Sequence, residues 1–260
     1  MDKKDKRGLR SDVPVHLFFK FSLFLSLIVS LLIPASPFLE YASSGPIISD
    51  LRFSIVTVDK TTDFPVERVS AGGGILAYGS GQHVDFALED EPFSPVSRLS
   101  FNGTISDILL LGKYAFIAQE GLGIRIIDLE LPSSPMDLGL YPLFGTAFRL
   151  ANWGNLLFVG GTDLGIRVFE LPQSHQEFQG HPRVNLIDRG WIPLEAPFLA
   201  MAASQGKLYV AGGGEGIRVF DVSNPLMIAE EEGLPVNLPI RSMAVNGNHL
   251  FVGAGAAGLH

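Results

Sequence analysis

Apolar and polar positions alternate over short runs along most of the chain, and glycine separates the runs. ILLL and YAFIA flank Gly112-Lys113, and SMAVN and HLFVG flank Gly247-Asn248. Gly-Lys or Gly-Asn between short apolar runs is typical of tight β-hairpins, where positive φ angles must be adopted. The pattern predicts many short strands joined by turns, and the 29 Gly and 17 Pro residues argue against long helices.

One heptapeptide recurs as GIRIIDL (123–129), GIRVFEL (165–171) and GIRVFDV (216–222), and HVDFAL (83–88) is a degenerate copy. The opening glycines of the three copies and Gly258, which opens a fourth, stand 42, 51 and 42 residues apart. A hairpin precedes each copy, and a Pro-bearing turn and another short run follow it. Four short strands in each repeat of this length are typical of a β-propeller blade. The predicted fold is therefore all-β, with four-stranded antiparallel blades.

Counting the repeats places the propeller in residues 45–260. Residues 66–236 supply four complete blades, and 240–260 begin a fifth whose third strand ends at 258–260. A blade cut in mid-strand exposes unpaired N–H and C=O groups, so we expect an incomplete propeller that is the N-terminal part of a longer protein. Alternatively, a five-bladed ring closes with LRFSIVTV (51–58) as the outer strand of the last blade.

The heptapeptide has large apolar side chains on both of its faces, as expected when each blade packs between two neighbours. Its last polar residue precedes a turn and is expected to accept backbone N–H bonds there; the copies have Asp128, Glu170 and Asp221. Its arginine is expected to pair with an acidic residue of the adjacent blade, or alternatively to form a ring that binds an anion; the copies have Arg125, Arg167 and Arg218.

The phrases GIRIIDLELPSSP, GIRVFEL and GIRVFDVSNP resemble the LVIVD repeat. This resemblance covers about 104–260 well and 66–103 weakly. It implies a β-propeller in a bacterial or archaeal envelope protein and implies no common catalytic residues. The third copy departs from the family pattern, because Glu170 replaces the terminal Asp and the Ser-Asn-Pro turn is missing.

Residues 1–44 resemble an export segment, with five cations in the first ten residues followed by an apolar stretch over 17–33. This stretch predicts an N-terminal hydrophobic helix. The uninterrupted apolar run from Phe21 to Ile33 has the length of a signal peptide, whereas counting from Leu17 with a snorkelling Lys20 gives a marginal membrane span. We favour an uncleaved membrane anchor, and a cleaved signal peptide is the alternative. The protein is expected to cross the cytoplasmic membrane and to stay anchored, periplasmic or at the cell surface, with only this segment in the membrane.

The net charge and the absence of cysteine exclude several kinds of partner and site. The formal net charge is −8, and beyond residue 44 acidic residues outnumber basic residues by ten. Such a domain repels a phosphate backbone, so we expect no nucleic acid partner. The absence of cysteine excludes disulfides, thiolate metal sites and a Cys nucleophile.

The longest repeat holds an insertion of about nine residues between its third and fourth strands, within SHQEFQGHPRVN (174–185). Loops on a rigid scaffold often carry binding groups, so this stretch is the candidate binding site. Its candidate residues are His175, Glu177, His181 and Arg183. The spacing of the two histidines and the glutamate matches no established metal motif, and no metal or other cofactor is predicted.

Two functions fit this pattern. The favoured hypothesis is a non-enzymatic extracytoplasmic propeller that binds another envelope protein or a glycan through its loops, or acts as a scaffold. The alternative is an extracytoplasmic propeller hydrolase or lactonase with a metal at the axial channel. The alternative requires non-repeated acidic or histidine residues at strand ends that face the channel, and the sequence shows no such set.

Overall fold

The computed structural model describes residues 66–92, 94–143, 147–161, 165–171, 176–178, 181–183, 185–194, 198–212 and 216–260. These residues form strands and one short 3-10 helix, and this part of the chain contains no helix long and apolar enough to span a membrane. The predicted N-terminal helix, the export segment 1–44 and the proposed strand 51–58 lie outside the described residues.

Four sheets of four strands follow one another along the chain, and we call them blades 1 to 4. Blade 1 contains β1 (Arg68–Gly72), β2 (Ile75–Ser80), β3 (His83–Leu88) and β4 (Ser97–Ser100). Blade 2 contains β5 (Ile105–Leu111), β6 (Tyr114–Gln119), β7 (Gly123–Asp128) and β8 (Met136–Pro142). Blade 3 contains β9 (Ala147–Trp153), β10 (Leu156–Gly161), β11 (Gly165–Glu170) and β14 (Ile187–Ile192). Blade 4 contains β15 (Phe198–Ser204), β16 (Lys207–Gly212), β17 (Ile217–Asp221) and β18 (Ala229–Leu234).

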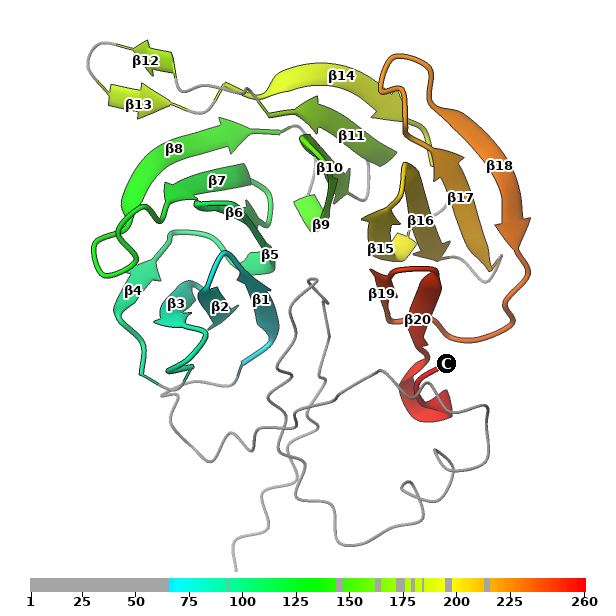
Figure 1. The fold of residues 1–260 in the computed structure, drawn as a ribbon, viewed down its shortest axis with the longest axis horizontal. Helices are drawn as coiled ribbons and strands as arrows, with labels where there is room; N and C mark the ends of the chain where they lie inside the picture. The colour runs from blue at the N-terminus through cyan, green and yellow to red at the C-terminus, as the bar shows by residue number, and fades with distance from the viewer. Residues whose placement is uncertain are drawn as a thin grey trace, which may run out of the picture.

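Each blade is an antiparallel meander, in which every strand pairs with the next strand of the same sheet. The first strands β1, β5, β9 and β15 lie innermost around a common axis, and the fourth strands lie outermost (Figure 1). Neighbouring inner strands contact each other around the arc, from β1 through β5 and β9 to β15. This arrangement is that of a β-propeller, as predicted.

The recurring heptapeptide forms the third strand of every blade, namely β3, β7, β11 and β17. The hairpin before it also recurs, with turns at Gly112-Lys113 and Gly154-Asn155 as predicted. In blade 4 the predicted turn is shifted by one residue, because Ser204 pairs with Lys207 and the turn is Gln205-Gly206. Gln205 adopts the positive φ of this turn, 50°. Lys207 is the first residue of β16 and is not part of the turn.

A two-stranded sheet follows blade 4 and contains β19 (Ser242–Asn246) and β20 (His249–Gly253). Its inner strand β19 contacts β15, and the 3-10 helix η3 (Gly255–Ala257) follows β20. Leu259 then bridges to Gly253, and His260 exchanges two backbone bonds with Val252 at 2.9 and 3.0 Å. The predicted third strand of a fifth blade therefore begins to pair at its expected register.

The hydrophobic core lies between neighbouring sheets, and blades 2, 3 and 4 are buried on both faces. Strand β6 shows this: Ala115 and Ile117 pack in the cluster shared with blade 1, while Phe116 and Ala118 pack in the cluster shared with blade 3. Two further clusters join blade 3 to blade 4, and blade 4 to the two-stranded sheet. The apolar groups on both faces of the repeat are thus explained, because alternate side chains fill different cores.

Candidate functional site

The acidic residue at the end of the recurring strand closes the turn that follows it. Asp128 accepts a hydrogen bond from the backbone N–H of Glu130 at 2.7 Å, and Asp221 accepts one from that of Ser223 at 2.9 Å. The prediction is confirmed in these two copies. Glu170 instead accepts from the side chain of Asn155, so the third copy differs where its sequence differs.

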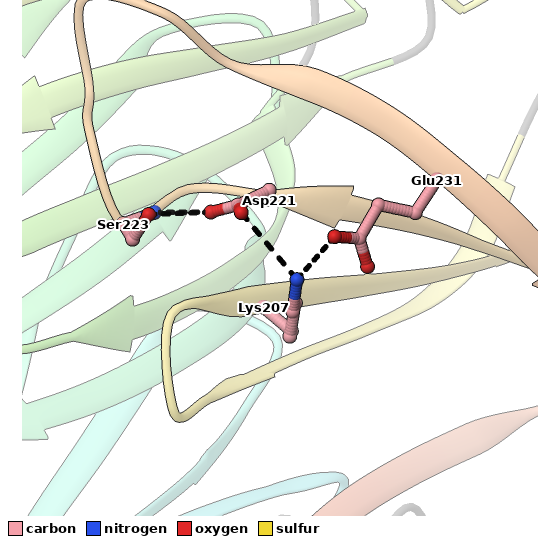
Figure 2. A network of polar contacts seen from close by, with 4 residues as sticks. All are labelled: Lys207, Asp221, Ser223 and Glu231. Atoms are coloured by element: carbon pink, nitrogen blue, oxygen red, sulfur yellow. Dashed lines mark hydrogen bonds and ion pairs between the residues drawn. The ribbon is translucent and has the colours of Figure 1, made fainter.

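A lysine on the neighbouring strand completes this arrangement in blade 4, as Figure 2 shows. Lys207 contacts Asp221 at 3.4 Å and forms a shorter ion pair with Glu231 on the outer strand. The hydrogen bonds from Ser223 lower the pKa of Asp221, and the bond with Glu231 raises the pKa of Lys207. In blade 2, Lys113 contacts Asp128 at 3.4 Å in the same way. The contact between lysine and aspartate is thus present in both blade 2 and blade 4, and its repetition favours a structural role.

The recurring arginine forms an ion pair inside its own blade, so the predicted pairing with an adjacent blade is wrong. Arg125 binds Asp137 of β8 at 2.6 Å, and Arg218 binds Glu230 of β18 at 2.6 Å. Arg167 and Asp188 form the equivalent pair in blade 3. The cause is local: neighbouring strands of one sheet place cross-strand side chains close together, whereas the face of the next blade is apolar.

Blade 3 departs from the repeat by the predicted insertion between its third and fourth strands. The insertion contains a small hairpin, with β12 (Gln176–Phe178) paired to β13 (His181–Arg183). This hairpin projects beyond the sheet, and β13 lies against β8 of blade 2 (Figure 1). The insertion therefore reaches over the outer edge of the neighbouring blade.

The candidate site residues fall on this hairpin as far as the structure describes them. Glu177 lies opposite Pro182, His181 lies opposite Phe178, and Arg183 lies opposite Gln176. The backbones of these three candidates are thus brought together, while His175 lies outside the described residues. Across the part of the chain that the structure describes, no three His, Asp or Glu residues gather closely enough to hold a metal ion.

A second feature of blade 3 was not predicted. Trp191 on β14 lies opposite Arg167 of β11, at the position that the half-buried Leu140 occupies opposite Arg125 in blade 2. Its side chain is 55% exposed. An exposed tryptophan is an unusual surface residue and is typical of contact sites. The signal was present in the sequence, because GLYP in one repeat becomes GWIP in the next.

The inner strands carry a further polar cluster that sequence reasoning missed. Arg68, Asp107 and Arg149 each stand four residues before the end of their inner strands β1, β5 and β9. Arg68 Nε donates to the carbonyl of Ser106 at 2.6 Å, and Arg149 Nε donates to that of Leu199 at 2.9 Å. Each bond joins one blade to the next. These positions are equivalent because each lies at the same distance from the end of its strand, and the strand ends are known only from the structure.

Comparison with known families finds a match for part of the repeat. The LVIVD repeat matches residues 102–141 and 201–232. Over these two segments the chain is similar to the LVIVD repeat. They correspond to blades 2 and 4, whereas blade 3, with its insertion, lies between the matched segments. The resemblance expected over 104–260 is thus confirmed for these two segments. No curated protein matches the chain.

Comparison with solved structures supports the propeller fold of the chain. The chain is similar to U3-55K, with 16% identity and a TM-score of 0.53, covering 74% of this chain and 62% of that one. It is similar to the β-propeller domain of Cps50 (Swd1) from Myceliophteria thermophila, with 10% identity, a TM-score of 0.50, and 75% and 81% coverage. The WD40 repeats of RRP9 match with 14% identity, a TM-score of 0.52, and 74% and 61% coverage. The chain thus spans less than two thirds of the first and third structures, and these similarities establish the fold alone.

Proposed function

We propose that this LVIVD-repeat propeller is a non-enzymatic extracytoplasmic module that binds a protein or glycan through the outer side of blade 3. One observation carries the proposal: blade 3 is the described blade in which an added hairpin and an exposed tryptophan both depart from the repeat. The repeated ion pairs are engaged within their own blades, so they serve blades 2, 3 and 4 alike. Features that differ between blades are better suited to a specific partner.

The chemistry of this side of the blade suits a contact surface. Trp191 presents a large rigid apolar group, and Arg167 and Asp188 form an ion pair on the adjoining strands. Tryptophan and arginine are enriched at the centres of interfaces. The basic and apolar order of residues 1–33 supports the extracytoplasmic location, and the acidic body supports a partner other than nucleic acid.

Two variants test the proposal. Deletion of 174–182 removes the nine-residue excess, and Trp191→Leu restores the residue type of blade 2. The full chain is immobilised and exposed to a glycan array and, separately, to solubilised envelope proteins from the source cell. We expect a partner of one class, with binding reduced at least tenfold in both variants.

A matched control keeps the result specific to blade 3. Leu131→Ala changes an exposed apolar side chain in the corresponding connection of blade 2, so it is expected to leave binding unchanged. Circular dichroism establishes that all variants are folded. A partner that both blade 3 variants bind as tightly as the unchanged chain would refute the assignment, and so would turnover of a captured glycan or ester by the purified chain.

A further inference from the structure

Arg167 of blade 3 is held differently from its counterpart in blade 2. In blade 2, Arg125 Nε donates to the side-chain oxygen of Gln119, the last residue of β6, at 3.0 Å. In blade 3, Gly161 takes the place of this glutamine, since each of the two residues pairs with the opening glycine of the next strand. Arg167 Nε is buried, and it has no hydrogen-bond acceptor within the part of the chain that the structure describes. Its guanidinium group is instead held by Asp188, through Nη2.

The ion pair of blade 3 is open to solvent although this one N–H group is buried. The side chains of Arg167 and Asp188 are 34% and 39% exposed. A guanidinium group has five N–H donors and a carboxylate has about four acceptor positions, so a single ion pair does not use all of them. A buried donor without an acceptor destabilises a folded protein, and native structures contain few such groups. Blade 3 therefore lacks an internal bond that blade 2 has, at an arginine that a ligand can reach.

The indole ring of Trp191 has a defined place beside this ion pair. Trp191 pairs with Arg167 across β14 and β11. A Cβ at Gly165, the first residue of β11, would lie 2.8 Å from the indole Nε1. At the equivalent Gly123 of blade 2, the three nearest atoms all belong to the backbone. The indole therefore lies over the opening glycine of blade 3, and it fits there because this residue has no side chain.

The exposed part of the indole has the size of one sugar ring. The side chain of Trp191 is 55% exposed, which leaves an apolar surface on the order of 100 Å². A stable protein interface buries about 800 Å² on each partner and is most apolar at its centre, whereas this apolar surface ends at an ion pair. The C–H groups on one face of a pyranose pack against the negative face of an aromatic ring. The hydroxyl groups around the same sugar both donate and accept hydrogen bonds.

We propose that Trp191, Arg167 and Asp188 form a carbohydrate-binding site on the outer side of blade 3. One pyranose ring of the glycan stacks on the exposed face of the indole. Its hydroxyl groups accept hydrogen bonds from the guanidinium group of Arg167 and donate to the carboxylate of Asp188, and bonds to charged groups are the stronger kind. This inference rests on the function proposed above, and it names a glycan rather than a protein as the partner.

Titration of the full chain with N,N′-diacetylchitobiose, cellobiose and lactose tests the site, with glycerol as a polyol that has no ring. The chain has two tryptophans, so its indole N–H groups give two NMR signals, and the signal lost in Trp191→Leu belongs to Trp191. We expect at least one disaccharide to bind saturably and to shift this signal, while the signal of Trp153 stays in place. Trp191→Leu is expected to weaken the binding at least tenfold, and Trp191→Phe, which keeps an aromatic ring, is expected to weaken it less.

The matched control for the ion pair is Arg125→Gln, which removes the equivalent arginine of blade 2 and its bond with Asp137. Arg167→Gln is expected to weaken sugar binding at least tenfold, whereas Arg125→Gln is expected to leave it unchanged. Equal weakening by these two variants overturns the site, and so does the absence of saturable binding to the three disaccharides and to the glycan array.

The same measurements separate this site from the function proposed above. A protein partner whose binding is weakened by Trp191→Leu would overturn the carbohydrate site and leave the proposed function in place. A partner of either class that binds equally well to the variants of blade 3 would overturn both.

Discussion

Replacing Gly165 by alanine is expected to destabilise the protein much more than replacing Gly154 by alanine. Both glycines have positive φ angles, +60° at Gly165 and +55° at Gly154. A Cβ at Gly165 would lie 2.3 Å from the carbonyl oxygen of Ile192, whereas a Cβ at Gly154 would meet nothing within 4 Å. The pair therefore separates the cost of the backbone conformation from the cost of the close approach between β11 and β14.

The magnitude follows from these two contributions. An L-residue in the left-handed region costs about 1–2 kcal/mol, and this cost applies to both variants. At Gly165 the carbonyl of Ile192 must also move, which pulls at a side chain that is only 4% exposed between blades 3 and 4. Losing the burial of an isoleucine costs about 1.5–3 kcal/mol. We therefore expect a loss of about 2.5–5 kcal/mol for Gly165→Ala and about 1–2 kcal/mol for Gly154→Ala.

Urea unfolding measures the difference. The two tryptophans of the chain, Trp153 and Trp191, lie on β9 and β14, so fluorescence reports on blade 3 itself. Circular dichroism serves as a second probe, because Trp191 lies close to Gly165. Free energies of unfolding that agree within about 0.5 kcal/mol for the two variants would refute the argument, since independent sites are additive to that precision.

Two further predictions concern charged side chains. Arg98→Ala is expected to cost about 3–5 kcal/mol in urea unfolding, because it strands the carboxylate of Asp85, which is 1% exposed. Arg218→Ala, whose partner Glu230 is 46% exposed, should cost less than about 1 kcal/mol, and equal losses would contradict this reasoning. The pKa of Asp221 is lowered by its bonds from Ser223, so its contribution to stability is present above its unfolded pKa of about 4 and is lost as the pH falls through the lower folded value. Asp221→Asn should therefore flatten the dependence of stability on pH below about 4, and an unchanged slope would contradict the assignment.

The placement of the third strands could be predicted because the repeat carries its own register. In GIRVFDV, alternation assigns Ile217 to one face and Phe220 to the other, and the structure buries them in two different clusters. The position of the insertion was predictable for the same reason, since the lengths of the flanking strands are constant. The hairpin formed by β12 and β13 was not predicted, because SHQEFQGHPRVN has no clear alternation.

The partners of the recurring arginines could not be predicted from the heptapeptide alone. The partners depend on an irregularity in the pairing of β7 with β8. Ile126 of β7 pairs with Gly139, whereas Ile127 pairs with Asp137, so the outer strand β8 has one extra residue there. There Asp137 accepts the backbone N–H of Gly139 at 2.9 Å while it binds Arg125. Asp188 and Gly190 form the same bond in blade 3. The sequence motif Asp-x-Gly is present in the fourth strands of both blades and could have indicated this bond. The partners of the recurring arginines are therefore indicated by a comparison of the fourth strands and not by a comparison of the third strands.

The polar cluster at the axis was missed for a different reason. Its positions carry Arg68, Asp107 and Arg149 in three successive blades, and the equivalent residue in blade 4 is Ala200, so no residue type is shared by all four blades. The equivalence comes from the strand ends, which the shifted turn at Gln205-Gly206 conceals in the sequence of blade 4. A residue type that changes from blade to blade leaves no trace in a search for repeats.

This contrast separates two kinds of position in the propeller. Where the copies agree, as at the opening glycines, the cause is a geometry that every blade shares: a Cβ at Gly123 or Gly216 would also lie within 2.5 Å of an outer-strand carbonyl. Where they disagree, packing does not require the change, since Leu140 serves blade 2 where blade 3 has Trp191. An exposed tryptophan gains nothing from the core that a leucine would not supply. A difference that is neutral for folding, such as Trp191, is a position at which binding can explain the residue.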